Sequence, residues 1–154
     1  MEQSAIRFRR AEAADVAAIV DILSDDPLGQ TRERPGLPLA GEYVTAFAAI
    51  AADHNQLLAV AVDGDSIVGT LQISFIPGLA RLGTMRGQIE AVRVAAAYRS
   101  SGLGQRFFEW AIEQCRQRGC KLVQLTTDKS RPDAHRFYDR LGFVASHEGY
   151  KLKL

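Results

Sequence analysis

The chain has 154 residues, of which 47% are hydrophobic and 24% charged, so it can bury a core and is not a disordered protein. Nineteen lysines and arginines against eighteen aspartates and glutamates leave a net charge of +1, which argues against a dedicated nucleic-acid-binding protein. The length is typical of one domain and no linker interrupts it, so we expect a single domain over residues 1–154.

Location and metal binding are constrained by what the sequence lacks. Its longest apolar runs, such as residues 57–62, are far shorter than the ~20 residues that span a bilayer, so we expect no membrane segment. The N-terminal residues do not resemble a secretory signal, which predicts a cytoplasmic protein. Cys115 and Cys120 lack the spacing of a zinc site and the three histidines are scattered, so we expect reduced cysteines and no metal.

The first third of the chain predicts a strand, a helix, a loop and a second helix. Residues 5–9 alternate apolar and polar side chains like a half-buried strand, and apolar residues then recur with helical spacing from Val16 to Leu23. Residues 24–38 hold three prolines and two glycines and predict a loop. Residues 43–51 resume the helical spacing.

The next segment predicts three strands. Asp63-Gly64 favours a tight turn between antiparallel strands 57–63 and 66–76. A Gly-rich connection then leads to a strand over residues 88–94, in which the apolar positions change parity after Ile89. A bulge near Glu90 would account for that change.

The last third predicts helices and strands in alternation. Helical periodicity covers residues 102–118, and an apolar strand pattern follows at 121–127. A short helix is expected over 133–141. Two closing strands are expected at 143–145 and 150–154. Because a helix joins strands 88–94 and 121–127, these two should be parallel, and the sheet of this α+β (α/β layered) domain should be mixed.

The segment from Val92 to Arg106 is the best candidate binding site. A strand ends, a short loop turns, and a Gly-containing start opens an amphipathic helix, so backbone N–H groups and the positive helix end point toward one place. No acidic residue lies between Ala91 and Phe108, while Arg93, Arg99 and Arg106 do. These features suit a phosphate group, although a Gly-rich helix start with solvated arginines would have the same pattern.

Two motifs resemble the GNAT family of N-acetyltransferases. Residues 99–104, RSSGLG, match the family's Q/R-x-x-G-x-G/A signature, and residues 133–143 resemble its second signature, an A-x-x-x-Y helix followed by Gly-Phe. The resemblance covers nearly the whole chain. It implies a mixed central sheet of about six to seven strands with about four helices on its faces.

The resemblance implies a site for acetyl-CoA. In this family a bulged fourth strand separates from the fifth and leaves room for the cofactor, and the pantetheine arm pairs with the strand backbone. The residues that this assigns to cofactor binding are Val92, Arg93 and Val94 for pantetheine, Arg99, Ser100, Ser101, Gly102, Leu103, Gly104 and Gln105 for pyrophosphate, and Phe137. Gly102 and Gly104 should tolerate no side chain.

Acetyl transfer to an amine needs a base for the amine, a donor to the thioester oxygen and a proton for the departing thiolate. The resemblance places Tyr138 as the acid that protonates the thiolate, whereas its helical spacing with Phe137 and Leu141 also fits a core residue with a polar tip. Glu90 is the candidate base, and a solvated strand carboxylate is the alternative. The amide of Val92 would polarise the thioester carbonyl by analogy with the family.

One position departs from the family pattern. Arg131 stands where members often carry Asn, so it either meets a CoA phosphate or is a solvated arginine beside a helix start.

The expected reaction is direct acetyl transfer, without an acyl-enzyme, to the primary amine of a small molecule. A protein N-terminus or lysine is an alternative acceptor, and a non-catalytic acyl-CoA-binding sensor module is an alternative function. We expect no nucleic-acid or membrane partner, and a homodimer is a frequent assembly in the family. Acidic residues at 25, 26, 33 and 42 would attract a cationic amine, or would simply be solvated.

Overall fold

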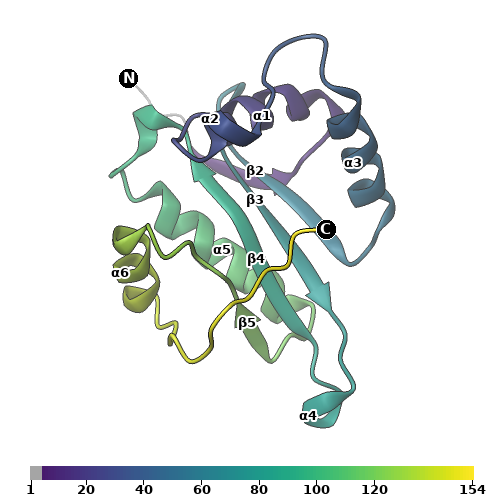
Figure 1. Cartoon of the computed structure of the whole chain (residues 1–154), viewed down its shortest axis with the longest axis vertical. Coiled ribbons are helices and arrows are strands. Elements are labelled where there is room, and N and C mark those ends of the chain that lie inside the picture. The colour runs from purple at the N-terminus through teal and green to yellow at the C-terminus, as the bar shows by residue number, and fades with distance from the viewer. Residues whose placement is uncertain (1–4) are drawn as a thin grey trace. The chain divides into compact units, whose positions relative to one another are not determined.

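The computed structural model describes residues 5–154, which form two compact units divided after Gln124. The first unit contains a five-stranded sheet in which the spatial order of the strands follows the chain. The strands are β1 (Arg7–Arg10), β2 (Gln56–Asp63), β3 (Ser66–Ile76), β4 (Arg86–Val94) and β5 (Leu122–Gln124). β1 to β4 pair antiparallel, and β5 pairs parallel to β4, so the prediction of a mixed sheet is confirmed (Figure 1).

Within residues 5–154, five helices belong to the first unit and one to the second. They are α1 (Val16–Ser24), α2 (Gly29–Arg32), α3 (Gly41–Ala52), α4 (Ala80–Gly83), α5 (Leu103–Gln117) and, in the second unit, α6 (Pro132–Arg140). Two 3-10 turns, Ala13–Asp15 and Ala96–Tyr98, precede α1 and α5. α4 is a tight turn rather than a regular helix, because Arg81 and Leu82 have left-handed backbone angles.

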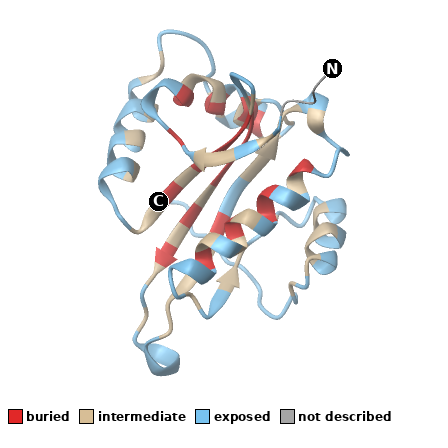
Figure 2. Cartoon of the chain, turned by 180° about the vertical axis from the view of Figure 1, so that it is seen from behind, coloured by how far each residue is buried: buried red, intermediate tan, exposed pale blue. Residues whose placement is uncertain are grey.

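α5 covers one face of the sheet. Phe107, Phe108, Ala111 and Cys115 of α5 are buried. Figure 2 shows buried (red) segments recurring along this helix. The ring of Phe107 stacks on Phe8 of β1, with centroids 4.9 Å apart. These contacts bring β1 and α5 into one core although nearly a hundred residues separate them in the chain.

Two glycines allow this close packing. An added Cβ at Gly87 of β4 would lie 2.4 Å from the sulfur of Cys115. At Gly69 of β3 it would lie 3.5 Å from Phe107. The helix therefore lies directly on the strand backbone at these two positions.

α1 and α3 pack against the opposite face. Ile19 of α1 belongs to a buried cluster with Val60 and Val62 of β2, and Phe47 of α3 packs against that cluster. The periodicity seen in the sequence thus correctly identifies the inward side of both helices.

β4 contains the predicted bulge. Thr70 pairs with Arg93 and Gln72 pairs with Glu90, so β4 has one more residue than β3 over this stretch. The extra residue lies beside Ala91, which has φ of 54°, a left-handed value. Since an added residue reverses the facing of every later side chain, the bulge explains the parity change after Ile89.

The predicted numbers of strands and helices are wrong. Among residues 5–154 there are five strands and six helices, not six to seven strands and about four helices. Segments 143–145 and 150–154 have no strand pairing, and β5 is only three residues long. A strand needs a neighbouring backbone as well as a suitable side-chain pattern. The extra helices, α2 and α4, are four residues each, too short to produce a periodic signal.

Candidate functional site: a bulged strand and an amide-rich loop

The edge of β4 beyond Gln88 is open within the first unit. β5 pairs with β4 only from Arg86 to Gln88. On its other side β4 remains paired with β3 through Val94. From Glu90 to Val94, one edge of β4 is therefore paired with β3 and the other edge is not paired with β5. A ligand can pair with such an edge in the way that an added strand would.

The loop from Ala95 to Gln105 follows directly. Gly102 has φ of 83° and Ser100 has φ of 63°, so the chain turns twice through the left-handed region before α5 begins. Glycine adopts this conformation without steric cost, whereas a serine there stores about 1 kcal/mol or more. Such stored strain is typical of functional loops.

The amides of this loop divide into two groups. Those of Tyr98, Arg99 and Ser101 donate to carbonyl groups within the loop, at 2.9, 3.3 and 3.3 Å. By contrast, within residues 5–154 no backbone oxygen accepts from the amides at positions 100, 102, 104 and 105. The second group is therefore available to an anion at the positive end of α5.

A hydrogen bond ties the loop to the β2–β3 hairpin. The hydroxyl of Tyr98 donates to Asp63 Oδ2 at 2.5 Å. The carboxylate raises the pKa of Tyr98, so the phenol stays protonated and the bond persists at neutral pH.

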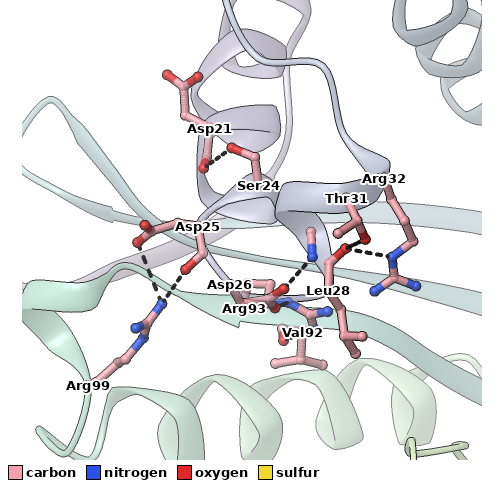
Figure 3. Close-up of polar contacts among 11 residues, drawn as sticks. Asp21, Ser24, Asp25, Asp26, Leu28, Thr31, Arg32, Val92, Arg93 and Arg99 are labelled. Carbon is pink, nitrogen blue, oxygen red and sulfur yellow. Dashed lines mark hydrogen bonds and ion pairs between the residues drawn. The ribbon is translucent and has the colours of Figure 1, made fainter.

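Two ion pairs join the α1–α2 connection to the same strand and loop, as Figure 3 shows. Arg93 Nε lies 2.7 Å from Asp26 Oδ2, although the two are not aligned as a hydrogen bond. Arg99 Nη2 lies 3.5 Å from Asp25 Oδ2 and donates to the Asp25 carbonyl at 3.2 Å. The first pair is about four-fifths buried and the second is half exposed, so the first holds the geometry more strongly.

The side chain of Arg93 has a second contact that matters for binding. Its Nη1 donates to the carbonyl oxygen of Val92 at 2.9 Å. Asp26 in turn accepts from the amide of Gly29, at the start of α2. The Arg93 guanidinium therefore contacts both the backbone near the end of β4 and the Asp26 carboxylate. The carboxylate balances its positive charge.

All four acidic residues proposed to attract an amine have partners. Asp25 and Asp26 pair with arginines as described, and Glu42 pairs with Arg34. Glu33 accepts from the hydroxyl of Tyr43 at 2.6 Å. These carboxylates serve to connect loops, a role that the sequence did not reveal because the partners of Asp25 and Asp26 lie more than sixty residues away.

Glu90 lies on β4 immediately before the bulge, and its residue is exposed. The bulge redirects the strand between Glu90 and Val92, so the candidate base and the candidate carbonyl-polarising amide are separated by a single residue with left-handed geometry. This local arrangement is compatible with the predicted roles of both.

Tyr138 and Phe137 belong to α6 of the second unit. The ring of Tyr138 contacts Phe137 and Phe143 edge to face, with centroids 5.6 and 6.1 Å apart. The amide of Phe143 donates to the Tyr138 carbonyl. Tyr138 is half-buried rather than enclosed, as are Ala134 and Leu141 of the predicted apolar stripe.

Arg131 is an exposed residue at the start of α6. Its carbonyl accepts from the amide of Ala134 at 3.1 Å, and its own amide donates to Asp128. Its backbone therefore organises the helix start.

The cysteines are free and unsuited to nucleophilic catalysis. Cys115 lies on the buried side of α5, and burial raises the pKa of its thiol to about 12. Burial also raises the pKa of Cys120. At neutral pH both remain thiols, as expected for structural residues.

Two further properties of residues 5–154 bear on the site. They contain no group of three or more His, Cys, Asp and Glu residues placed to hold a metal ion. None of their helices has the length and apolar character needed to cross a membrane.

Comparison with known proteins identifies the family. A sequence profile of the Acetyltransferase (GNAT) family matches residues 16–143, which include the bulged strand, the amide-rich loop and α6. The chain belongs to the GNAT acetyltransferase family. The GNAT match runs through both compact units.

Two individual relatives are about one third identical to this chain in sequence. The chain is 34% identical over 101 residues to the aminoalkylphosphonate N-acetyltransferase of Salmonella typhimurium. The matched segment covers 66% of this chain and 65% of that protein. The chain thus spans just under two thirds of that relative's length. It is 32% identical over 152 residues to glucosamine 6-phosphate N-acetyltransferase 1 of Oryza sativa subsp. japonica, covering 91% of this chain and 82% of that one.

A solved structure is more similar. A protein from Bacillus halodurans C-125, described as a transcriptional regulator, is 49% identical, with a TM-score of 0.95 over 97% of this chain and all of that one. The similarity extends to the whole fold of this GNAT chain.

The residues present fit acetyl-CoA. Unpaired amides at a helix start, with arginines close by in the chain, suit a pyrophosphate group. The free edge of β4 supplies backbone groups for an extended amide-containing arm.

Proposed function

We propose that this chain is an acetyl-CoA-dependent N-acetyltransferase that acts directly on the primary amine of a small molecule, as one domain over residues 1–154. The observation that carries the proposal is the bulge at Ala91, followed by the open β4 edge and the unpaired loop amides, in a chain of the GNAT family. Acetyl-CoA supplies the activated acetyl group when bound.

The residues of the chain have separate tasks in this proposal. The amides of Ser100, Gly102, Gly104 and Gln105 bind phosphate oxygens, and the backbone from Val92 to Val94 orients the pantetheine arm. Phe137 and Arg131 are further proposed cofactor contacts. Glu90 accepts a proton from the amine nitrogen, directly or through water, and the Val92 amide donates to the thioester oxygen. Tyr138 Oη gives a proton to the leaving sulfur.

The acceptor is proposed from the relatives. The Salmonella and rice proteins are described as acetylating an aminoalkylphosphonate and glucosamine 6-phosphate, which are small amines. This supports a small-molecule acceptor, with a protein N-terminus or lysine as the alternative. The free cysteines are consistent with the proposed cytoplasmic location. A homodimer remains part of the proposal, to be checked by the mass of the protein in solution.

A second candidate function has one specific observation in its favour. The Bacillus halodurans protein that is 49% identical is described as a transcriptional regulator. A GNAT fold that binds acyl-CoA without turnover would act as a sensor module. Glu90 and Tyr138 favour the enzyme, because a binding module needs neither a base nor an acid.

One experiment separates these functions. Isothermal titration with CoA and acetyl-CoA is followed, in the same preparation, by thiol release against polyamines, aminoglycosides, amino acids and peptides. We expect binding of acetyl-CoA and thiol release with one class of amine. Binding without release across the panel would establish the sensor, and a folded sample that binds no CoA would exclude both.

The base is tested by Glu90→Gln. Its glutamine cannot accept a proton, so we expect acetyl transfer to fall about 100-fold at low pH, where most of the acceptor amine is protonated. The loss should shrink as pH rises, because the amine then loses its proton without help. The measurement is kcat/KM against pH.

Glu113→Gln, on the exposed side of α5, is the matched control and should keep the wild-type profile. A Glu90→Gln enzyme whose profile parallels that of wild type would show that Glu90 is not the base.

A further inference from the structure

One face of the sheet carries a row of polar side chains across four strands. Gln56 of β2 pairs with Ser74 of β3, Ser74 with Gln88 of β4, and Gln88 with Gln124 of β5. Residues paired in this way point to the same face. Gln72 lies two residues before Ser74 on β3 and therefore points the same way. All five are half-buried. We call Gln56, Gln72, Ser74, Gln88 and Gln124 the amide row.

The amide row lies on the face opposite α5. Gly87, next to Gln88, is the residue that meets Cys115 of α5, so Gln88 points away from that helix. The β2 end of the same face is apolar, with Val60 and Val62 in the core beneath α1 and α3. The polar character therefore begins where the apolar core of this face ends.

Glu90, the proposed base, has two glutamines of the amide row as neighbours. It is the direct cross-strand partner of Gln72, and it lies two residues after Gln88 on β4. The pairing of β3 with β4 is regular here, because the bulge begins only after Glu90. All three side chains therefore share one face, and directly paired side chains have Cβ atoms about 5 Å apart.

The two glutamines differ in which amide atom is already bonded. Gln88 Oε1 accepts from Gln124 Nε2 at 3.0 Å, so its oxygen is occupied. Gln72 has the opposite arrangement, because its Nε2 donates to Gln56 Oε1 at 2.9 Å. Within residues 5–154 no donor bonds to Gln72 Oε1, and this oxygen is not buried. Next to Glu90, Gln72 therefore offers a free hydrogen-bond acceptor and Gln88 does not.

Gln56 fixes the orientation of the Gln72 amide. Gln56 Oε1 accepts from Ser74 Oγ at 3.1 Å as well as from Gln72 Nε2. A Gln72 amide turned over would bring its oxygen against the oxygen of Gln56, so the nitrogen stays on that side. Since the nitrogen and oxygen of a carboxamide diverge, Gln72 Oε1 faces away from Gln56.

We propose that Gln72 Oε1 binds the acceptor nitrogen beside Glu90 and makes the enzyme selective for primary amines. The inference rests on the proposed function. A primary amine that attacks the thioester carbonyl through its lone pair has two N–H groups. One proton passes to Glu90 as the N–C bond forms and the C–S bond breaks. The other hydrogen stays on the amide product and donates to Gln72 Oε1.

A secondary amine cannot satisfy both groups. Its single N–H is the one that Glu90 must take, so Gln72 Oε1 receives no hydrogen bond and loses its contact with water. Gln72 therefore acts as a substrate-binding residue, and Gln56 is the residue that positions it.

The test compares acceptors that differ by one N-methyl group. Each amine of the panel that releases thiol, such as β-alanine or 2-aminoethylphosphonate, is assayed against its mono-N-methyl derivative. We expect wild type to favour the primary amine in kcat/KM by about 10-fold or more. Gln72→Met keeps the length of the side chain but removes the free oxygen, and it should lower that ratio by about 5-fold or more. Its affinity for acetyl-CoA, measured by isothermal titration, should stay as in wild type.

Gln124→Met is the matched control. It also removes a half-buried glutamine and one side-chain hydrogen bond from the amide row, and it should keep the wild-type ratio. Gln56→Met is a second variant, which leaves Gln72 in place but removes the oxygen that holds its Nε2. It should lower the ratio by a smaller factor than Gln72→Met does.

Two results would overturn the inference while leaving the acetyltransferase intact. One is a wild type that acetylates primary and N-methyl amines equally well, a measurement that does not depend on the folding of any variant. The other is a folded Gln72→Met that keeps the wild-type ratio. A chain that binds acetyl-CoA but acetylates no amine of the panel would overturn the proposed function instead.

Discussion

Replacing Tyr138 by phenylalanine is expected to lower kcat for acetyl transfer about 100-fold while leaving the affinity for acetyl-CoA nearly unchanged. The phenylalanine ring can keep the edge-to-face contacts with Phe137 and Phe143, so the substitution removes the hydroxyl and little else. Without that hydroxyl the departing thiolate must leave unprotonated or take its proton from water. Steady-state kinetics together with isothermal titration measure both quantities.

Tyr150→Phe is the control for Tyr138, because Tyr150 lies in the same unit and its residue is 90% exposed. It should match wild type in rate and in thermal stability. If Tyr138→Phe unfolds at a clearly lower temperature than wild type, the alternative interpretation of Tyr138 as a core residue with a polar tip gains support. If it is stable and fully active, Tyr138 is not the acid.

A valine at Gly102 is expected to weaken acetyl-CoA binding by at least about 10-fold. Gly102 has φ of 83°, and a side chain there strains the turn that aims the loop amides, besides standing between those amides and a phosphate. An added Cβ meets no protein atom within 4 Å, so the loss would arise from the backbone angle and the ligand rather than from a clash. Isothermal titration with acetyl-CoA gives the change.

Gly119 offers a closely matched control for Gly102. It follows α5, has φ of 82°, and an added Cβ there also meets nothing within 4 Å. Gly119→Val should therefore lose a similar amount of stability, of the order of 1–2 kcal/mol, yet bind acetyl-CoA as wild type does. Equal loss of binding in both variants would mean that general destabilisation, and not the anion site, is responsible.

Local features of the structure could be predicted from the sequence. The Asp63-Gly64 turn, the extents of α1, α5 and α6 to within two residues, and the bulge beside Glu90 all depend on side-chain period or on the backbone freedom of glycine. These properties are set by neighbours in the chain. The candidate site was found in this way because its loop and helix start are contiguous.

The strand count was not predictable from the same signals. Residues 143–145 and 150–154 have apolar side chains that suit a strand, yet they pair with no strand in the described chain. β5 covers three residues, whereas the apolar pattern predicted a strand over residues 121–127. Pairing depends on which distant backbone lies alongside, and this is decided by the packing of the whole unit.

By itself, the sequence determined the order of the elements, the bulged strand, the amide-rich loop and the two motifs of the family. Only the tertiary structure showed that Asp25 and Asp26 pair with arginines, and that Gln56, Ser74, Gln88 and Gln124 line up across four strands. The physical reason is the range of the interactions. Tight turns and the periodicity of apolar side chains depend on residues that are close in the chain. Ion pairs and cross-strand rows form between residues that are distant in the chain and meet only in the folded protein.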